Sequence, residues 1–157
     1  MNSIPIPDMD TLVKQEQEAR FSSFSFADAW SLGNILYQKA LERKAPVALE
    51  IYAFNQVLFQ VSLPESAPDN LEWMRRKRNT VLRMTHSSLL VGQSNDKMGA
   101  RMEQQNFINQ AEYCDHGGSF PLRLTSGAVI GAVSASGLPS HEDHALVFDS
   151  INTFLHQ

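Results

Sequence analysis

Two stretches of strand-like alternation, separated by a long helical stretch, constrain the fold of this chain more than any other feature. Large apolar residues occupy every second position over 47–51 and again over 57–61. A period of two is typical of a strand with one buried face, so 47–61 predicts a β-hairpin. Asn55 tolerates the positive φ of a tight turn between the two strands, although the favoured Asn-Gly pair is missing.

A second hairpin is predicted after the Gly117-Gly118 pair. Its strands cover 120–124 and 128–135, with Thr125-Ser126-Gly127 as the turn. Pro121 has no N–H to donate to a sheet, so the first of these strands is expected to start at this proline or to lie at a sheet edge.

The remaining patterns are helical. The spacing predicts helices over 8–20, capped by Asp8, over 27–44, and from a cap at Asp69 or Asn70 to about Leu90. A polar stretch over 94–110 favours a helix interrupted at Gly99, and a last helix starts at Ser140, where Ser140 and Asp143 have capping-box spacing. Residues 21–26 predict a short extended piece with inward phenylalanines. Together these elements predict an α/β (α+β) fold, a central antiparallel sheet with helices packed on it, in a single domain over 1–157.

Composition excludes several classes of function. The net charge is −4, which argues against nucleic acid and anionic membranes as partners. No apolar run approaches the roughly 20 residues that span a bilayer, and 1–14 does not have the pattern of a secretory signal. A lone cysteine, Cys114, permits no intrachain disulfide. We therefore expect a cytoplasmic protein with no membrane or nucleic-acid partner.

Five segments carry a family resemblance. The runs 117–122 and 127–138, followed by Glu142-Asp143-His144, resemble the haem-degrading-domain family, which includes haem-binding sensor proteins and a glycolate-operon orphan. The run 73–83 with His86-Ser87-Ser88 is similar to an uncharacterised branch of that family. The resemblance implies a profilin-like fold assembled into homo-oligomers, and haem as a possible ligand. It supplies no catalytic residues, so the catalytic set is unknown.

The strand that contains Gly131 has small side chains on both faces. Such a strand allows either a helix to pack closely on the sheet or a flat or anionic ligand to lie on it. Ser136-Gly137 then leads the chain to a helix start at Ser140, where free N–H groups attract carboxylates such as haem propionates. Alternatively, Glu142 and Asp143 satisfy that helix end themselves.

Histidines offer further candidates. His141 and His144 lie three apart on one helix face, where the helix dipole favours the neutral form that binds metal or haem iron. The alternative is a partly buried histidine beside Phe148, and because the other ligands of a metal shell are missing, no metal site is predicted. The Cys114-Asp115-His116 run permits a nucleophile pair or a packed, inert cysteine. The sequence His86-Ser87-Ser88 alone supplies neither an oriented acid nor an oxyanion hole.

A basic run covers 75–78, with Arg83 close behind. It predicts a solvated surface with salt bridges between subunits. The alternative is a grip on a small anionic ligand by bidentate arginines, which makes Arg75 and Lys77 secondary site candidates.

The favoured hypothesis is a homo-oligomeric protein that binds a small ligand, haem or a related tetrapyrrole. The alternatives are a non-enzymatic adaptor or assembly module, and an enzyme acting on a small anionic metabolite. The predicted ligand-binding residues are Gly131, Ser136, Gly137, His141, His144, Arg75 and Lys77.

Overall fold

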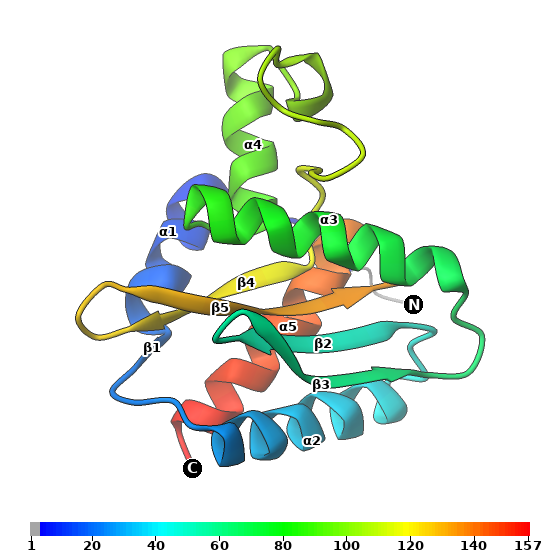
Figure 1. Ribbon diagram of the computed structural model, residues 1–157, viewed down its shortest axis with the longest axis vertical. Helices are drawn as coiled ribbons and strands as arrows, with labels where there is room; N and C mark the ends of the chain where they lie inside the picture. The colour runs from blue at the N-terminus through cyan, green and yellow to red at the C-terminus, as the bar shows by residue number, and fades with distance from the viewer. Residues whose placement is uncertain (1–3) are drawn as a thin grey trace.

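A five-stranded sheet with helices on both faces organises residues 4–157, which the computed structural model describes (Figure 1). The first three residues of the segment examined for a secretory signal lie outside that range. The strands are β1 (Arg20–Phe21), β2 (Ala48–Ala53), β3 (Gln56–Ser62), β4 (Ser119–Leu124) and β5 (Val129–Ser136), in the order β1-β4-β5-β2-β3. All neighbours are antiparallel except β1 and β4, which confirms the predicted sheet and both hairpins.

Within residues 4–157, five α-helices lie around the sheet. They are α1 (Met9–Glu18), α2 (Phe26–Glu42), α3 (Pro68–Met84), α4 (Ser88–Met98) and α5 (Ser140–Leu155). Helices α2 and α5 cover one face, α3 crosses the other, and α1 packs against α4 beside the sheet (Figure 1). Within 4–157, no helix is both long enough and apolar enough to cross a bilayer.

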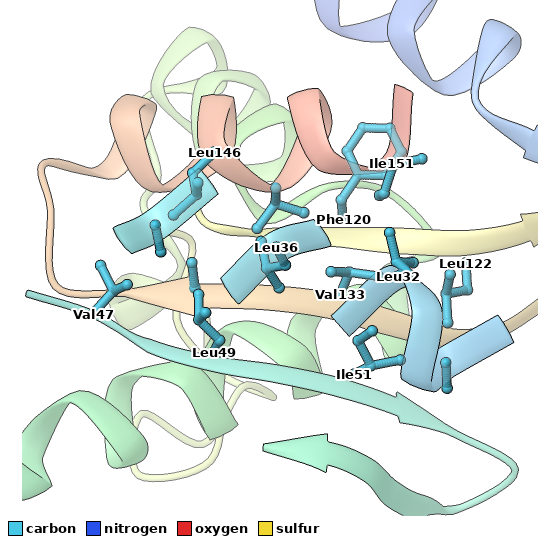
Figure 2. Close-up of a cluster of buried hydrophobic side chains, with 14 of the residues drawn as sticks. Leu32, Leu36, Val47, Leu49, Ile51, Phe120, Leu122, Val133, Leu146 and Ile151 are labelled. Carbon is cyan, nitrogen blue, oxygen red and sulfur yellow. The ribbon is translucent and has the colours of Figure 1, made fainter. Parts of the chain in front are cut away.

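The main hydrophobic core lies between the sheet and helices α2 and α5. Leu49 and Ile51 of β2 and Val133 of β5 point toward Leu36 and Leu146, and all five side chains are fully buried (Figure 2). This core confirms the alternation predicted for β2, because the intervening residues lie on the opposite face.

That opposite face of β5 carries small residues. Ala132, Ser134 and Ser136 lie under α3, which makes its most extensive sheet packing against β5. The Ser134 hydroxyl lies 2.7 Å from the Ser119 hydroxyl, so the buried polar atoms of this face satisfy each other. The small side chains let the helix approach the sheet, which confirms close helix packing as one use of this strand.

Turn chemistry explains the first hairpin. Phe54 and Asn55 have φ values of 55° and 61°, and two central residues with positive φ are the pattern of a type I′ turn, which suits the twist of a hairpin. Pro121 lies in the part of β4 that β1 leaves unpaired, because β1 reaches only Arg123 and Leu124. The strand itself starts at Ser119 and is second in the sheet order, so the predicted edge position holds only for the side of this segment that β1 leaves unpaired.

The single helix predicted to reach Leu90 is wrong. Thr85 takes a left-handed conformation with φ of 60° and ends α3, and the Ser87 side chain then caps α4 by accepting from the Leu90 N–H at 3.2 Å. The predicted cap is also wrong, because the helix starts at Pro68 and Asn70 lies in its first turn.

Two other local predictions need correction. Phe21 and Phe24 are buried as predicted, but Phe26 begins α2 and is 61% exposed. Gly99 ends α4 with φ of 78°, while the residues after it form only a short 3-10 turn, Met102–Gln104, rather than a resumed helix.

Candidate functional site

A polar cleft of about 280 Å³ lies where α3 meets the end of β5 and the start of α5. We call it the Lys77 cleft. Its lining contains three of the predicted site residues, Lys77, Ser136 and Gly137; the rest of the lining is Asn70, Trp73, His116, Leu138, Ser140 and Asp143. The sheet brings these residues together because β5 ends beneath the first half of α3.

A buried ion pair forms the floor of the Lys77 cleft. The Lys77 ammonium donates to Asp143 Oδ2 at 3.1 Å and to the Ala135 carbonyl at 3.1 Å, and the two side chains are only 4% and 1% exposed. Lys77 is three residues after Met74 and four before Val81, both buried, so it lies on the inner face of α3. Its charge is buried with a partner, as buried charges require.

Asp143 also holds the backbone that sequence analysis predicted to attract a ligand. Its carboxylate accepts from the Gly137 N–H at 3.2 Å and from the Leu138 N–H at 3.0 Å. The predicted capping box is wrong, because Ser140 is the first helical residue, Pro139 is the N-cap, and no side chain caps that end. Burial raises the pKa of Asp143 above its ordinary value, while Lys77 and the two amides oppose the rise.

The glycines of this strand are placed by packing. A Cβ on Gly131 would lie 1.9 Å from the Tyr52 carbonyl oxygen, and one on Gly137 would lie 2.2 Å from the Pro46 carbonyl oxygen. Both positions therefore exclude a side chain because β2 and the residues before it approach closely. Gly131 does not line the Lys77 cleft.

The two predicted histidines of α5 also lie outside this cleft. His141 is half-buried. His144 is buried beside Phe120 and Phe148, its Nε2 lies 2.7 Å from the Gln15 side-chain oxygen, and its Nδ1 has no partner in the described part of the chain. Burial lowers the pKa of His144 to about 4, so this ring is neutral at pH 7, next to the phenylalanine that the alternative hypothesis named.

The basic run of α3 is engaged within the chain rather than forming a free basic surface. Arg75 pairs with Glu112 at 2.8 Å and Glu72 at 3.3 Å. Arg78 pairs with the buried Glu50 at 2.8 Å. The Arg76 guanidinium lies 4.5 Å from the centre of the Trp73 ring, and those of Arg78 and Arg83 lie over Tyr52 and Tyr113. The predicted solvated surface is thus wrong for Lys77, which is buried, whereas the arginines stay partly exposed and pair within the chain. Arg75 lies outside the Lys77 cleft. Ligand binding by these residues stays a prediction.

Cys114 and His116 do not form a nucleophile pair. The thiol is buried, and burial raises the pKa of Cys114, which disfavours the reactive thiolate. His116 stands edge-on to Trp73 at 5.2 Å between ring centres, and burial lowers the pKa of His116.

A second candidate site surrounds His86, in the break between α3 and α4. Two clefts share Val13, His86 and Leu90 in their linings. The larger, about 440 Å³, is mostly apolar; we call it the methionine cleft, and its other lining residues are Met9, Met84, Val91, Ser94, Asn95, Met98 and Gln105. The smaller, about 200 Å³, is the arginine cleft, with Glu16, Gln17, Arg20 and Arg123.

Hydrogen bonds fix His86 at this junction. Its Nδ1 lies 2.9 Å from Glu16 Oε1, and the other oxygen of Glu16 accepts from the Ser87 N–H at 3.2 Å. The bond to Glu16 raises the pKa of His86, against the opposing effects of burial and of Arg123. No partner contacts His86 Nε2 within residues 4–157, so this nitrogen is available for a ligand.

Sequence analysis did not identify this second site. Glu16 and His86 are 70 residues apart, and neither has a neighbour in sequence that indicates the contact. The His86-Ser87-Ser88 run was used for the family resemblance and was examined for an oriented acid and an oxyanion hole, not for a ligand site. In the described part of the chain, no three His, Cys, Asp or Glu side chains come together as a metal site.

Known proteins resemble this chain in sequence and in fold. The sequence model of the family described as haem degrading protein HbpS-like matches residues 24–152. A UPF0303 protein of Psychromonas ingrahamii is 42% identical over 147 residues, covering 94% of this chain and 92% of that relative.

Solved structures share the fold. The crystal structure of Ybr137w protein matches with a TM-score of 0.87 at 29% identity, covering 97% of this chain and 91% of that one. PduOC in its complex with haem matches with a TM-score of 0.71 at 20% identity, covering 83% and 94%. At that second identity the likeness concerns the fold alone.

Proposed function

Since this chain belongs to the family of HbpS-like haem-degrading proteins, we propose that it is a small-ligand-binding protein whose ligand is haem or a related tetrapyrrole. A tetrapyrrole is a flat apolar ring with carboxylates at one edge, so its site needs an apolar wall beside cationic groups. The haem-degrading description of the family and the haem complex of the structural neighbour PduOC make this ligand class the first to test.

One observation carries the proposal: the methionine cleft adjoins the arginine cleft. The first offers Met9, Met84 and Met98, flexible thioether side chains that adapt to aromatic surfaces. The second offers Arg20 and Arg123, and the Nε of Arg20 is buried without a partner among the described residues. The guanidinium groups of these two arginines are the cationic groups that would pair with the propionates of a tetrapyrrole. The methionine cleft alone is within the usual size range of ligand pockets, about 300–1,000 Å³.

A hemin titration tests the proposal. We expect the Soret band to shift from that of free hemin and to saturate as protein is added. Met98→Glu places a charge in the methionine cleft and should weaken binding about ten-fold, or ~1.4 kcal/mol, because a charge against an apolar ring is poorly solvated. Phe107→Glu is the matched control, since Phe107 is exposed and lines neither cleft.

Two results would contradict the proposal. Spectra that match those obtained with an unrelated protein of equal size would exclude specific binding. Equal weakening by Met98→Glu and Phe107→Glu would remove the methionine cleft as the site.

We also propose that copies of this chain associate through β3 and α2. Strand β3 is the last in the sheet order, so one backbone edge is unpaired, and its sequence Gln56–Ser62 has no charge and no proline. Monomeric proteins protect such edges with charges, prolines or bulges, and of these β3 has only a bulge at Leu58, between the pairs Ile51–Phe59 and Tyr52–Val57. Trp30, 65% exposed, and Val57 extend this apolar surface.

Light scattering after size exclusion tests the association. We expect wild-type protein to be an oligomer and Val57→Lys to shift it toward the monomer, whereas Phe107→Lys, an equally drastic change on a distant loop, should leave the mass unchanged. A monomeric wild type would refute the association.

A further inference from the structure

We infer that His86 is the side chain that ligates the iron of a bound haem through its Nε2, with Glu16 as the residue that positions the imidazole. This inference rests on the proposed function, and it assigns a residue that the family membership does not.

The break between α3 and α4 presents His86 to the clefts. Thr85 takes its left-handed conformation at the end of α3, and Ser87 caps α4. His86 is therefore the one residue between a helix end and a helix cap. Its side chain is 54% exposed and lines both the methionine cleft and the arginine cleft. A ligand that spans the two clefts must pass this ring.

Glu16 selects the useful tautomer. A carboxylate 2.9 Å from Nδ1 accepts the Nδ1 proton, so the lone pair of the neutral ring lies on Nε2. Histidines that bind metals commonly donate their other nitrogen to a carboxylate, which orients the ring and raises its basicity. Here the arrangement is present in the chain itself.

Glu16 is itself held in place. Its side chain is 6% exposed, one oxygen accepts from the Ser87 N–H, and the other lies 3.6 Å from an Arg123 nitrogen. Arg123 also donates to the Thr85 carbonyl. Contacts from β4 and the helix break thus converge on one carboxylate of α1, which is what a residue that orients another side chain requires.

The other four histidines are unsuited to this role. The Nε2 of His144 contacts Gln15, and the ring is buried in the core. His116 faces the polar and smaller Lys77 cleft. His156 lies at the C-terminal end of α5, with its Nδ1 on the Asn152 carbonyl, and His141 lines neither of the two clefts. Only His86 combines a ring nitrogen that has no partner within the described residues with a position in the mostly apolar methionine cleft.

The experiment compares hemin binding by wild type, His86→Gly and the matched control His116→Gly. We expect wild type and His116→Gly to give the same Soret maximum and affinity. His86→Gly should lose the histidine-ligated spectrum and bind at least about ten-fold more weakly. Added imidazole should restore the spectrum of His86→Gly, because it fills the space of the deleted ring, and should leave His116→Gly unchanged.

A second variant tests the positioning residue. Glu16→Gln keeps a hydrogen-bond acceptor but removes the charge, so hemin should still bind, about ten-fold more weakly, with a shifted iron–histidine stretching frequency in the resonance Raman spectrum of the reduced complex. An unchanged frequency would refute the role of Glu16. Circular dichroism of each variant establishes that it is folded, and His86→Gln replaces His86→Gly if the glycine unfolds the break.

The outcomes separate the two proposals. Wild type that binds hemin, with His86→Gly indistinguishable from it, overturns the iron ligand and leaves the proposed function standing. Wild type that fails to bind hemin overturns both. A shift in His86→Gly that imidazole reverses supports both.

Discussion

The Lys77 cleft and the paired clefts at His86 differ in how their polar groups are satisfied. In the Lys77 cleft, the ammonium and the amides of Gly137 and Leu138 all donate to the Asp143 carboxylate, and the ammonium donates to the Ala135 carbonyl as well. At His86, one ring nitrogen and the Nε of Arg20 have no partner within the described residues. Both regions contain a cation beside a carboxylate, but the charged pair of the Lys77 cleft is satisfied within the chain, whereas His86 keeps one ring nitrogen open.

The comparison teaches that charge in a cleft is not by itself a sign of a ligand. A buried pair that is fully hydrogen-bonded contributes to the specificity of packing and becomes costly only when broken. A group held in place on one side and open on the other is prepared for a partner. On this basis, changes in the Lys77 cleft should act mainly on stability and changes at His86 mainly on binding.

The largest expected effect is that of Lys77→Met. It retains the volume of the side chain but leaves Asp143 buried without its cation, so the free energy of unfolding should fall by about 3–5 kcal/mol. The matched control is Arg75→Met, whose ion pairs are on the surface and should cost less than ~1 kcal/mol. Urea denaturation followed by circular dichroism measures both. Equal, small losses in the free energy of unfolding would show that the Lys77 pair stabilises no more than a surface pair, and would contradict the proposed difference between the two regions.

The second largest effect is expected in the pH dependence of stability. The pKa of His144 is about 4 in the folded protein and ~6.5 when unfolded, so the unfolded state binds the proton more tightly. Stability from the neutral ring is complete above pH ~6.5 and is lost as the pH falls toward 4, by about 3 kcal/mol in full. His144→Gln, which does not titrate, should show a flatter profile in urea denaturation between pH 7.5 and 4.5. Profiles of equal slope would contradict a buried neutral ring.

His86 contributes with the opposite sign. Because Glu16 raises the pKa of His86, the folded state binds this proton more tightly than the unfolded state. The resulting stability is present below the unfolded pKa and is lost as the pH rises through the folded one. A proton on His86 also removes the lone pair that would bind iron, so acid should stabilise this contact and oppose ligand binding.

A third prediction concerns the glycine that was expected to make room for a ligand. Gly137 has φ of 149°, and an added Cβ would meet the Pro46 carbonyl oxygen, so Gly137→Ala should cost about 2 kcal/mol of stability. Gly127→Ala is the control: its φ is 99°, but nothing lies within 4 Å of an added Cβ, so only the backbone cost of about 1 kcal/mol remains. Thermal unfolding compares them. If Gly137→Ala is as stable as wild type but no longer binds hemin, the glycine serves a binding site rather than close packing.

The sequence predicted the architecture well where a pattern was local. The period of two over 47–51 placed Leu49 and Ile51 in the core, and Asp8 and Ser140 marked helix starts, because side-chain alternation and helix boundaries depend on near neighbours. The helix break at Thr85 was missed because no glycine or proline marks it. A threonine takes the left-handed conformation only when surrounding contacts impose it.

The sites were harder to predict because their residues meet through contacts between distant parts of the chain. Lys77 was grouped with its basic neighbours, although its spacing from Met74 and Val81 was a signal that it points inward. Asp143 was recognised as an acid near a helix start, but the partner that neutralises it comes from another helix. The Glu16–His86 contact joins α1 to the end of α3, and only the folded chain reveals it.

The smallest expected effect gives the sharpest distinction between the two regions. His86→Ala removes an exposed ring, while its partner Glu16 keeps its bond to the Ser87 N–H and its proximity to Arg123. The free energy of unfolding should therefore change by less than ~1 kcal/mol. The same protein should lose most of its hemin affinity, whereas Lys77→Met, measured while folded, should retain it. Urea denaturation and hemin titration give a free energy of unfolding and a hemin affinity for each of the two variants. If His86→Ala proves as destabilising as Lys77→Met, then His86 is part of the structural framework, and its free nitrogen has no bearing on binding.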